Sequence, residues 1–283
     1  LSRLDLVARL VVEGFITGLH RSPYHGFSVE FAEYRQYMPG DAFRDVDWKL
    51  FAKTDRLYVK QYEEETNLKA YLLLDASASM DYGSGALSKF RYATFTAAAL
   101  AHLMLKQRDA VSLVAFDAGI RSYLPPRSVS SHLHALLTTL DGISPDGSDT
   151  DLAATFHELA ERIVRRGLVI ALSDLMDDPD RLISGLKHFR HRKHEVIVFH
   201  ILDPRERDLA FGRETRFVDL ETGAALATEP WHIASDYRAE MDALVDRFRR
   251  ECRNSLIDYV PVDTSQPFDD VLINYLAKRK KLF

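Results

Sequence analysis

The chain has 283 residues, of which 46% are hydrophobic and 28% charged, and its formal net charge is −5. This balance is typical of a globular protein with a sizeable core, and the mild acidity argues against a chain that mainly binds nucleic acid or a membrane surface. The single cysteine, Cys252, cannot form an internal disulfide, which fits a reducing compartment. We therefore expect a cytoplasmic protein that associates with membranes only through partners.

The first 67 residues are expected to form an N-terminal helix and a strand-containing pre-domain packed on the core. Apolar residues recur at helical spacing over residues 2–19, and the charged side chains among them argue against a signal peptide. Residues 27–31 and 57–60 alternate as half-buried strands do, and residues 38–41 form a strong turn signal. The longest uncharged run, residues 92–105, is shorter than the roughly 18–20 residues that cross a bilayer, so no membrane span is predicted.

From residue 68 to residue 283 the pattern changes to strands that alternate with helices. Short, nearly continuous apolar strands between helices indicate an α/β domain with a mostly parallel, Rossmann-like sheet covered on both faces. An insertion near residues 211–230 reads as a hairpin over residues 215–227. The predicted strands are 70–74, 110–116, 120–124, 168–172, 195–202 and 256–260, and the predicted helices are 90–107, 130–140, 151–165, 179–188, 237–250 and 268–280.

Oxygen-bearing side chains stand where strands of this domain end or helices begin. Asp75, Ser77 and Ser79 follow one strand, Asp174 follows another, and Thr150 precedes a helix. Taken singly, such residues are ordinary caps and turn formers. Ligands in open α/β sheets collect at the carboxyl ends of strands, so we expect the five to converge there. Two carboxylates and three hydroxyls form a hard ligand set that suits Mg²⁺ or Mn²⁺ and does not suit Zn²⁺.

An ion held by so few charges keeps an exchangeable water, which a carboxylate from another protein could replace. The set Asp75-Ala-Ser77-Ala-Ser79, with Thr150 and Asp174, resembles the metal-ion-dependent adhesion site of the von Willebrand factor type A domain family. The resemblance implies that Ser77, Ser79 and Thr150 bind the metal directly. It also implies that Asp75 and Asp174 act largely through water.

A second resemblance comes from the segment upstream of this site. The run EYRQYMPGD and the stretch FRDVDWKLFAKTDRLYVKQYEEE resemble the signature of the bacterial family called "domain of unknown function 58". Members of that family carry such an A domain and are usually associated with MoxR-type AAA+ ATPases. The resemblance implies a non-enzymatic, metal-dependent protein-interaction module. We expect it to be an adaptor for such an ATPase that remodels or matures a protein complex and binds an acidic protein ligand.

Two other functions have some support in the sequence. A magnesium-dependent phosphohydrolase could use Asp75 as its nucleophile, but Ser77 stands where such enzymes usually carry a second acidic residue. RNA binding is disfavoured by the acidic balance. Charged and aromatic residues lie close together in the upstream segment. They form either a docking surface for a partner or an ionic and aromatic lock that holds the pre-domain to the core, and we favour the lock. These residues are Arg35, Asp41, Arg44, Asp45, Asp47 and Trp48.

Overall fold

A computed structural model describes residue 4 and residues 28–38, 46–65, 68–146, 151–212 and 214–272. The helix predicted over residues 2–19 lies outside these ranges except for Leu4, and Thr150 lies outside them as well. The chain divides into two compact units, one of residues Arg21–Leu68 and one of Leu1–His20 with Lys69–Phe283.

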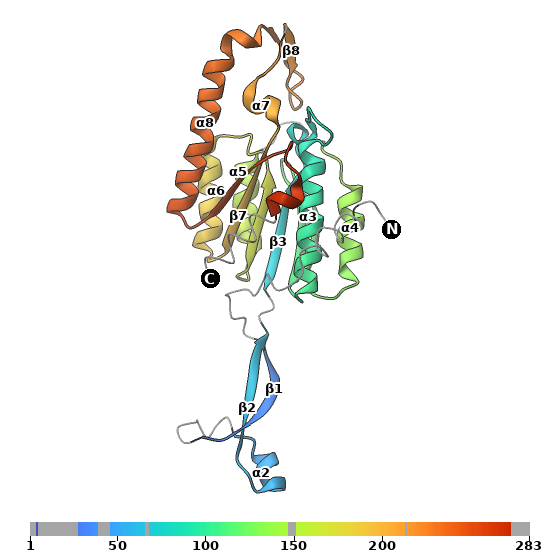
Figure 1. The fold of residues 1–283 in the computed structure, drawn as a ribbon, viewed down its shortest axis with the longest axis vertical. Coiled ribbons are helices and arrows are strands. Elements are labelled where there is room, and N and C mark those ends of the chain that lie inside the picture. The colour runs from blue at the N-terminus through green and yellow to red at the C-terminus, as the bar shows by residue number, and fades with distance from the viewer. Residues whose placement is uncertain are drawn as a thin grey trace. The chain divides into compact units, whose positions relative to one another are not determined.

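The larger unit is built on a six-stranded sheet with the order β10-β7-β6-β3-β4-β5 (Figure 1). All neighbouring strands are parallel except β5, which runs antiparallel to β4. The predicted fold class, a mostly parallel sheet flanked by helices, is confirmed. The strands are β3 (Lys69–Asp75), β4 (Ala110–Phe116), β5 (Ile120–Arg127), β6 (Leu168–Ser173), β7 (Glu195–Leu202) and β10 (Asp258–Asp263).

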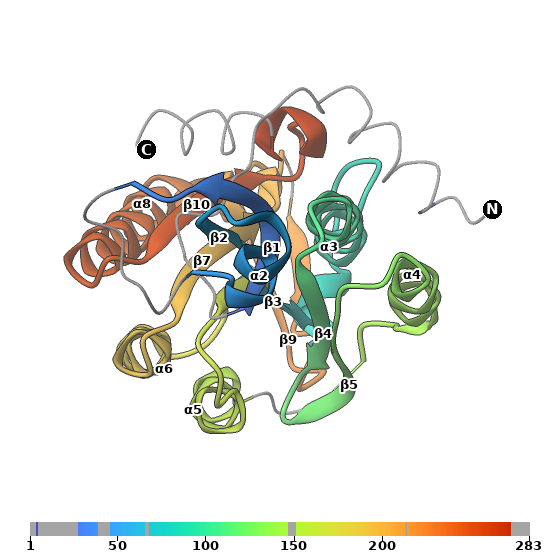
Figure 2. The ribbon, with the colours of Figure 1, turned by 90° about the horizontal axis from the view of Figure 1, so that it is seen from below.

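Helices cover both faces of this sheet (Figure 2). On one face lie α3 (Lys89–Lys106) and, packed against it, α4 (His132–Gly142). On the other lie α5 (Leu152–Arg162), α6 (Pro179–His191) and α8 (Pro230–Asn254). Two-sided cover explains why every residue of β4 and β6 is buried, as their continuous apolar runs predict. In β5 exposed and half-buried residues alternate, and its two prolines fit the edge of a sheet.

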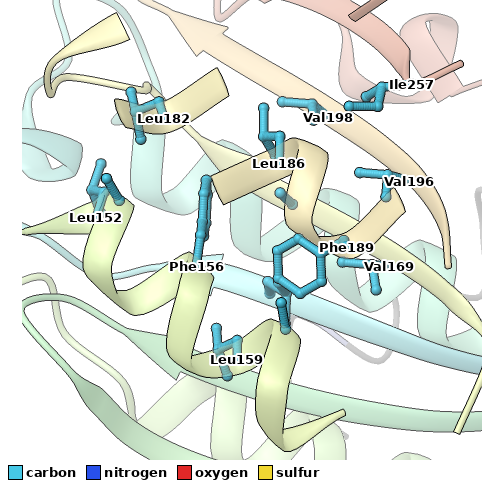
Figure 3. Close-up of a cluster of buried hydrophobic side chains, with 14 of the residues drawn as sticks. Leu152, Phe156, Leu159, Val169, Leu182, Leu186, Phe189, Val196, Val198 and Ile257 are labelled. Atoms are coloured by element: carbon cyan, nitrogen blue, oxygen red, sulfur yellow. The ribbon is translucent and has the colours of Figure 1, made fainter. Parts of the chain in front are cut away.

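The core beneath α5 and α6 is closely packed (Figure 3). Phe156 of α5 lies between Phe116 of the sheet and Phe189 of α6, with ring centroids 5.6 and 6.1 Å away. A Cβ atom on Gly185 would lie 2.9 Å from the Cβ of Phe156, so α5 and α6 approach this closely because position 185 carries no side chain. Cys252 of α8 joins the same core, and burial raises the pKa of its thiol to about 12.

The order of the strands creates a switch point between β3 and β6. The chain passes from β3 to β4 on one side and returns to β6 on the other side of β3. Open α/β sheets bind ligands at the carboxyl ends of the strands that flank such a point. Asp75 is the last residue of β3, and Asp174 directly follows β6.

The sequence prediction missed several shorter or extended elements. The last long helix begins at Pro230 instead of residue 237, because proline is compatible with a first helical turn. The short helix α7 (Pro204–Asp208) is too brief to show helical periodicity. The predicted hairpin is present as β8 (Thr215–Val218) and β9 (Ala225–Thr228). Among the residues that the structure describes, no helix combines the length and apolar character needed to span a bilayer.

The smaller unit contains an antiparallel ribbon and one short helix. Strand β1 (Ser28–Gln36) pairs with β2 (Tyr58–Glu65), with an irregularity between Phe31 and Glu33. Helix α2 (Trp48–Thr54), which the sequence analysis did not predict, lies between them in the chain.

Candidate functional site

Asp75 is fully buried at the carboxyl end of β3, and both of its carboxylate oxygens accept hydrogen bonds. The Ser77 backbone N–H donates to Oδ1 over 3.0 Å, and the Ser173 hydroxyl donates to Oδ2 over 2.5 Å. Burial, followed by the nearby charge of Asp174, raises the pKa of Asp75 to about 7. The hydroxyl oxygens of Ser77 and Ser79 lie 3.0 Å apart in the same loop. A carboxylate and two hydroxyls therefore stand together beside a second buried carboxylate.

Asp174 has a positively charged partner inside the protein. The ammonium of Lys89, at the start of α3, donates to Asp174 Oδ2 over 2.7 Å and to Glu206 Oε1 of α7 over 2.7 Å. The Lys89 and Asp174 side chains are fully buried, and that of Glu206 is 18% exposed. Burial alone would lower the pKa of Lys89, but the two carboxylates outweigh burial and raise it. Burial raises the pKa of Glu206, and the charge on Asp174 raises it further, although Lys89 acts in the opposite direction.

His200 of β7 contacts the backbone of the loop that carries Asp174. Its Nε2 lies 2.9 Å from the Asp174 carbonyl oxygen and its Nδ1 lies 2.5 Å from the Tyr259 hydroxyl. A carbonyl only accepts, so Nε2 carries the proton, and Nδ1 of the neutral ring accepts from Tyr259. Burial lowers the pKa of His200 to about 4, which keeps the ring neutral and this arrangement intact at pH 7.

The segment that leads to Thr150 is tied to the Asp75 loop. The Asp146 N–H donates to the Ala76 carbonyl over 3.1 Å. The Arg121 guanidinium donates to the carbonyls of Ser144 and Asp146, each over 3.0 Å. Residues 147–150 lie outside the described ranges, so the position of Thr150 stays a prediction. Of the five predicted ligands, the structure brings Asp75, Ser77, Ser79 and Asp174 to one edge of the sheet.

Sequence reasoning missed the residues that hold the two aspartates. Lys89, Ser173 and Glu206 bind their carboxylates or share their counter-charge, yet Lys89 lies 85 residues before Asp174 and 117 before Glu206. One signal was available, since Lys89 opens an alanine-rich helix that is mostly buried, and a buried lysine needs a partner of opposite charge.

The donor set was compared with the needs of a divalent ion. Asp75, Ser77 and Ser79 offer adjacent hard oxygens. Burial and then the charge of Asp174 raise the pKa of Asp75, and a bound cation would favour its ionised form. Oδ2 of Asp174 is taken by Lys89, so this carboxylate fits a water-mediated role better than direct binding. Over the part of the chain that the structure describes, no group of three or more His, Cys, Asp or Glu residues is placed to hold a metal, so any site depends on the hydroxyls.

The geometry defines an α/β protein with a polar site at the switch point of its sheet. The family model described as "Protein of unknown function DUF58" matches residues 33–251, and the chain belongs to this family. An uncharacterized protein of Mycobacterium tuberculosis, Rv1480, is 27% identical over 291 residues, which cover 99% of this chain and 89% of that protein. The uncharacterized protein YeaD of Bacillus subtilis is 26% identical over 148 residues, or 52% of this chain and 35% of YeaD.

Two solved structures align with most of this chain at low sequence identity. The conserved hypothetical protein BatB from Bacteroides thetaiotaomicron aligns with a TM-score of 0.49 and 15% identity, covering 76% of this chain and all of that chain. The VWA domain of SpRpn10 aligns with a TM-score of 0.41 and 13% identity, covering 73% of this chain and 94% of that domain. Membership of the family therefore rests on the sequence match.

Proposed function

We propose that this chain is a non-enzymatic, divalent-metal-dependent protein-interaction module whose metal site is formed by Asp75, Ser77, Ser79, Thr150 and Asp174. The main support is that Asp75 and the paired hydroxyls of Ser77 and Ser79 meet at the switch point beside Asp174. A bound Mg²⁺ or Mn²⁺ would supply an open coordination position for a carboxylate of an acidic partner. The protein's own residues fix the donors in place, since Ser173 and the Ser77 N–H hold Asp75 while Lys89 holds Asp174.

The wider role, an adaptor for a MoxR-type AAA+ ATPase in the remodelling or maturation of a protein complex, is part of the same proposal. Its support is the family resemblance. It predicts that this chain and the ATPase of the same bacterium associate in Mg²⁺ and separate when EDTA removes the metal.

The rival function, a phosphohydrolase with Asp75 as nucleophile, has a specific structural difficulty. Both carboxylate oxygens of Asp75 already accept hydrogen bonds, and the side chain is fully buried. A nucleophilic carboxylate needs one ionised oxygen facing the substrate. The raised pKa of Asp75 also lowers the fraction of the ionised form at neutral pH.

The decisive experiment measures Mn²⁺ binding by electron paramagnetic resonance and isothermal titration. Wild-type protein should bind one ion, and Asp75→Ala should bind none while its circular dichroism stays unchanged. Asp236→Ala is the matched control, because Asp236 is an exposed carboxylate on α8. Equal binding by Asp75→Ala and wild type would remove the basis of the proposal. Association with the ATPase, measured with and without EDTA, then tests the wider role.

A further inference from the structure

Residues 46–59 of the smaller unit, called the tip segment below, form a well-connected piece of structure around helix α2. The Asp47 carboxylate caps the helix by accepting from the N–H groups of Lys49 and Leu50, at 2.9 and 3.1 Å. Asp55 closes the helix in the left-handed region, with φ of 57°. Val46 and Val59 are buried and bridge the two sides of the segment. Its backbone is therefore held in one shape before any partner arrives.

The tip segment nevertheless exposes its largest side chain. Trp48, the first residue of α2, is 55% exposed, and its ring meets Phe51 edge-on at 6.1 Å between centroids. A tryptophan carries a large apolar area, so leaving it in water forgoes stabilisation that burial would supply. The helix that Asp47 caps therefore carries an exposed aromatic ring in its first turn.

The exposed charges of the tip segment are mainly positive. Lys49, Lys53 and Arg56 are all exposed, and within the described part of the chain none of them has an ion-pair partner. Asp55 is the one exposed carboxylate of the tip segment. Lys49 and Lys53 are four residues apart on one helix, an arrangement of like charges that slightly destabilises the helix. This cationic surface belongs to a chain whose net charge is −5, so its sign is opposite to that of the protein as a whole.

We propose that the tip segment is a docking surface for a protein partner that receives Trp48 in an apolar pocket lined at its rim by carboxylates. Charge complementarity points to an acidic partner, because Lys49, Lys53 and Arg56 have no ion-pair partner among the residues that the structure describes. Tryptophan and arginine are enriched among the strongly contributing contacts of protein interfaces, and the tip segment exposes one of each, Trp48 and Arg56. A seven-residue helix with one exposed aromatic ring offers little apolar area to a bilayer, which favours a protein over a membrane.

This surface uses residues separate from the proposed metal ligands and needs no metal. It would give the chain a second means of binding, as an adaptor requires. The docking surface can therefore be tested in EDTA, where metal-dependent binding does not occur. A failure of this proposal is then distinct from a failure of the proposed metal-dependent function.

The probe is a display library of short random peptides, selected on the full-length protein in EDTA. Selected peptides should combine Asp or Glu with apolar residues. Trp48→Ser should weaken their binding by about 30-fold, the loss typical of a central interface tryptophan. The double variant Lys49→Glu with Lys53→Glu should also weaken peptide binding, and by more at low salt than at high salt, because salt screens exposed charges. Trp231→Ser is the matched control, since Trp231 is 47% exposed in the larger unit and should leave binding unchanged.

Three outcomes would overturn the proposal. One is selection of peptides without acidic enrichment, or with equal affinity for Trp48→Ser. Another is Trp48-dependent sedimentation with phosphatidylglycerol vesicles, which would assign the segment to a membrane. The last is a lower unfolding temperature of the whole chain in both Trp48→Ser and the double lysine variant, which would make the segment an internal packing element.

Discussion

The strongest test of the site's electrostatics is the replacement of Lys89 by methionine. Methionine retains most of the apolar stem and removes the ammonium that Asp174 and Glu206 share, each at 2.7 Å. Because Lys89 and Asp174 are fully buried, the change leaves a carboxylate with neither water nor a counter-charge. Removal of one partner from a buried ion pair typically costs about 3–5 kcal/mol. That is a large part of the roughly 5–15 kcal/mol by which a protein is stable.

The measurement is urea unfolding at pH 7, followed by circular dichroism, with Arg162→Met as the control. Arg162 and Glu158 are also 2.7 Å apart, but their side chains are 62% and 45% exposed. Exposed pairs of this kind contribute about 0.3–0.5 kcal/mol. The loss in Lys89→Met should therefore be several times the loss in Arg162→Met and should persist in high salt. Equal losses of unfolding free energy in the two variants would show that the buried ion pair stabilises the protein no more than the exposed one.

The same variant bears on the proposed metal. With the ammonium gone, Asp174 gains from any cation that reaches it, so Mg²⁺ should stabilise Lys89→Met more than it stabilises wild type. A ligand that binds only the folded state stabilises it by RT ln(1 + [L]/Kd), so the gain should grow with Mg²⁺ concentration. A gain that is the same in both proteins would separate Asp174 from the metal site.

Two further predictions use the same unfolding assay. Burial lowers the pKa of His200 from 6.5 in the unfolded chain to about 4 in the fold, so roughly 3 kcal/mol of stability present above pH 6.5 is lost as the pH falls to 4. The difference in stability between wild type and His200→Gln should shrink by this amount over that range. A difference that does not change with pH would contradict the buried neutral ring. Gly185→Ala should destabilise the protein by about 1–3 kcal/mol, although alanine favours helices, because its Cβ would lie 2.9 Å from that of Phe156. An increase in stability would mean that α5 and α6 can move apart at little cost.

The sheet was predictable from the sequence because its central strands are continuous apolar runs between helices. The residues of β4 and β7 were predicted with their observed boundaries, since each run is bounded by charged or turn residues. The positions of Asp75 and Asp174 followed from the same patterns, as each ends a strand. What could not follow was the order of the strands, because local patterns carry no information about which strands become neighbours.

The missed site residues share one physical cause. Ser173 reaches Asp75 across 98 residues of sequence, and Lys89 reaches Glu206 across 117. Such pairs exist because β3, β6 and β7 lie side by side and end at the same edge. Glu206 also sits on a five-residue helix that leaves no periodic signal. Long-range polar contacts therefore become visible once the topology is known.

The burial of Cys252 has a practical consequence for experiments on this protein. The thiolate is the form that reacts with maleimides and similar reagents, and a thiol with a pKa of about 12 inside a packed core supplies almost none of it at neutral pH. Because this sequence contains no other cysteine, we expect the folded chain to react little with thiol-specific labels. A dye or spin probe placed through Lys53→Cys would report from that one position, without any prior removal of a natural thiol.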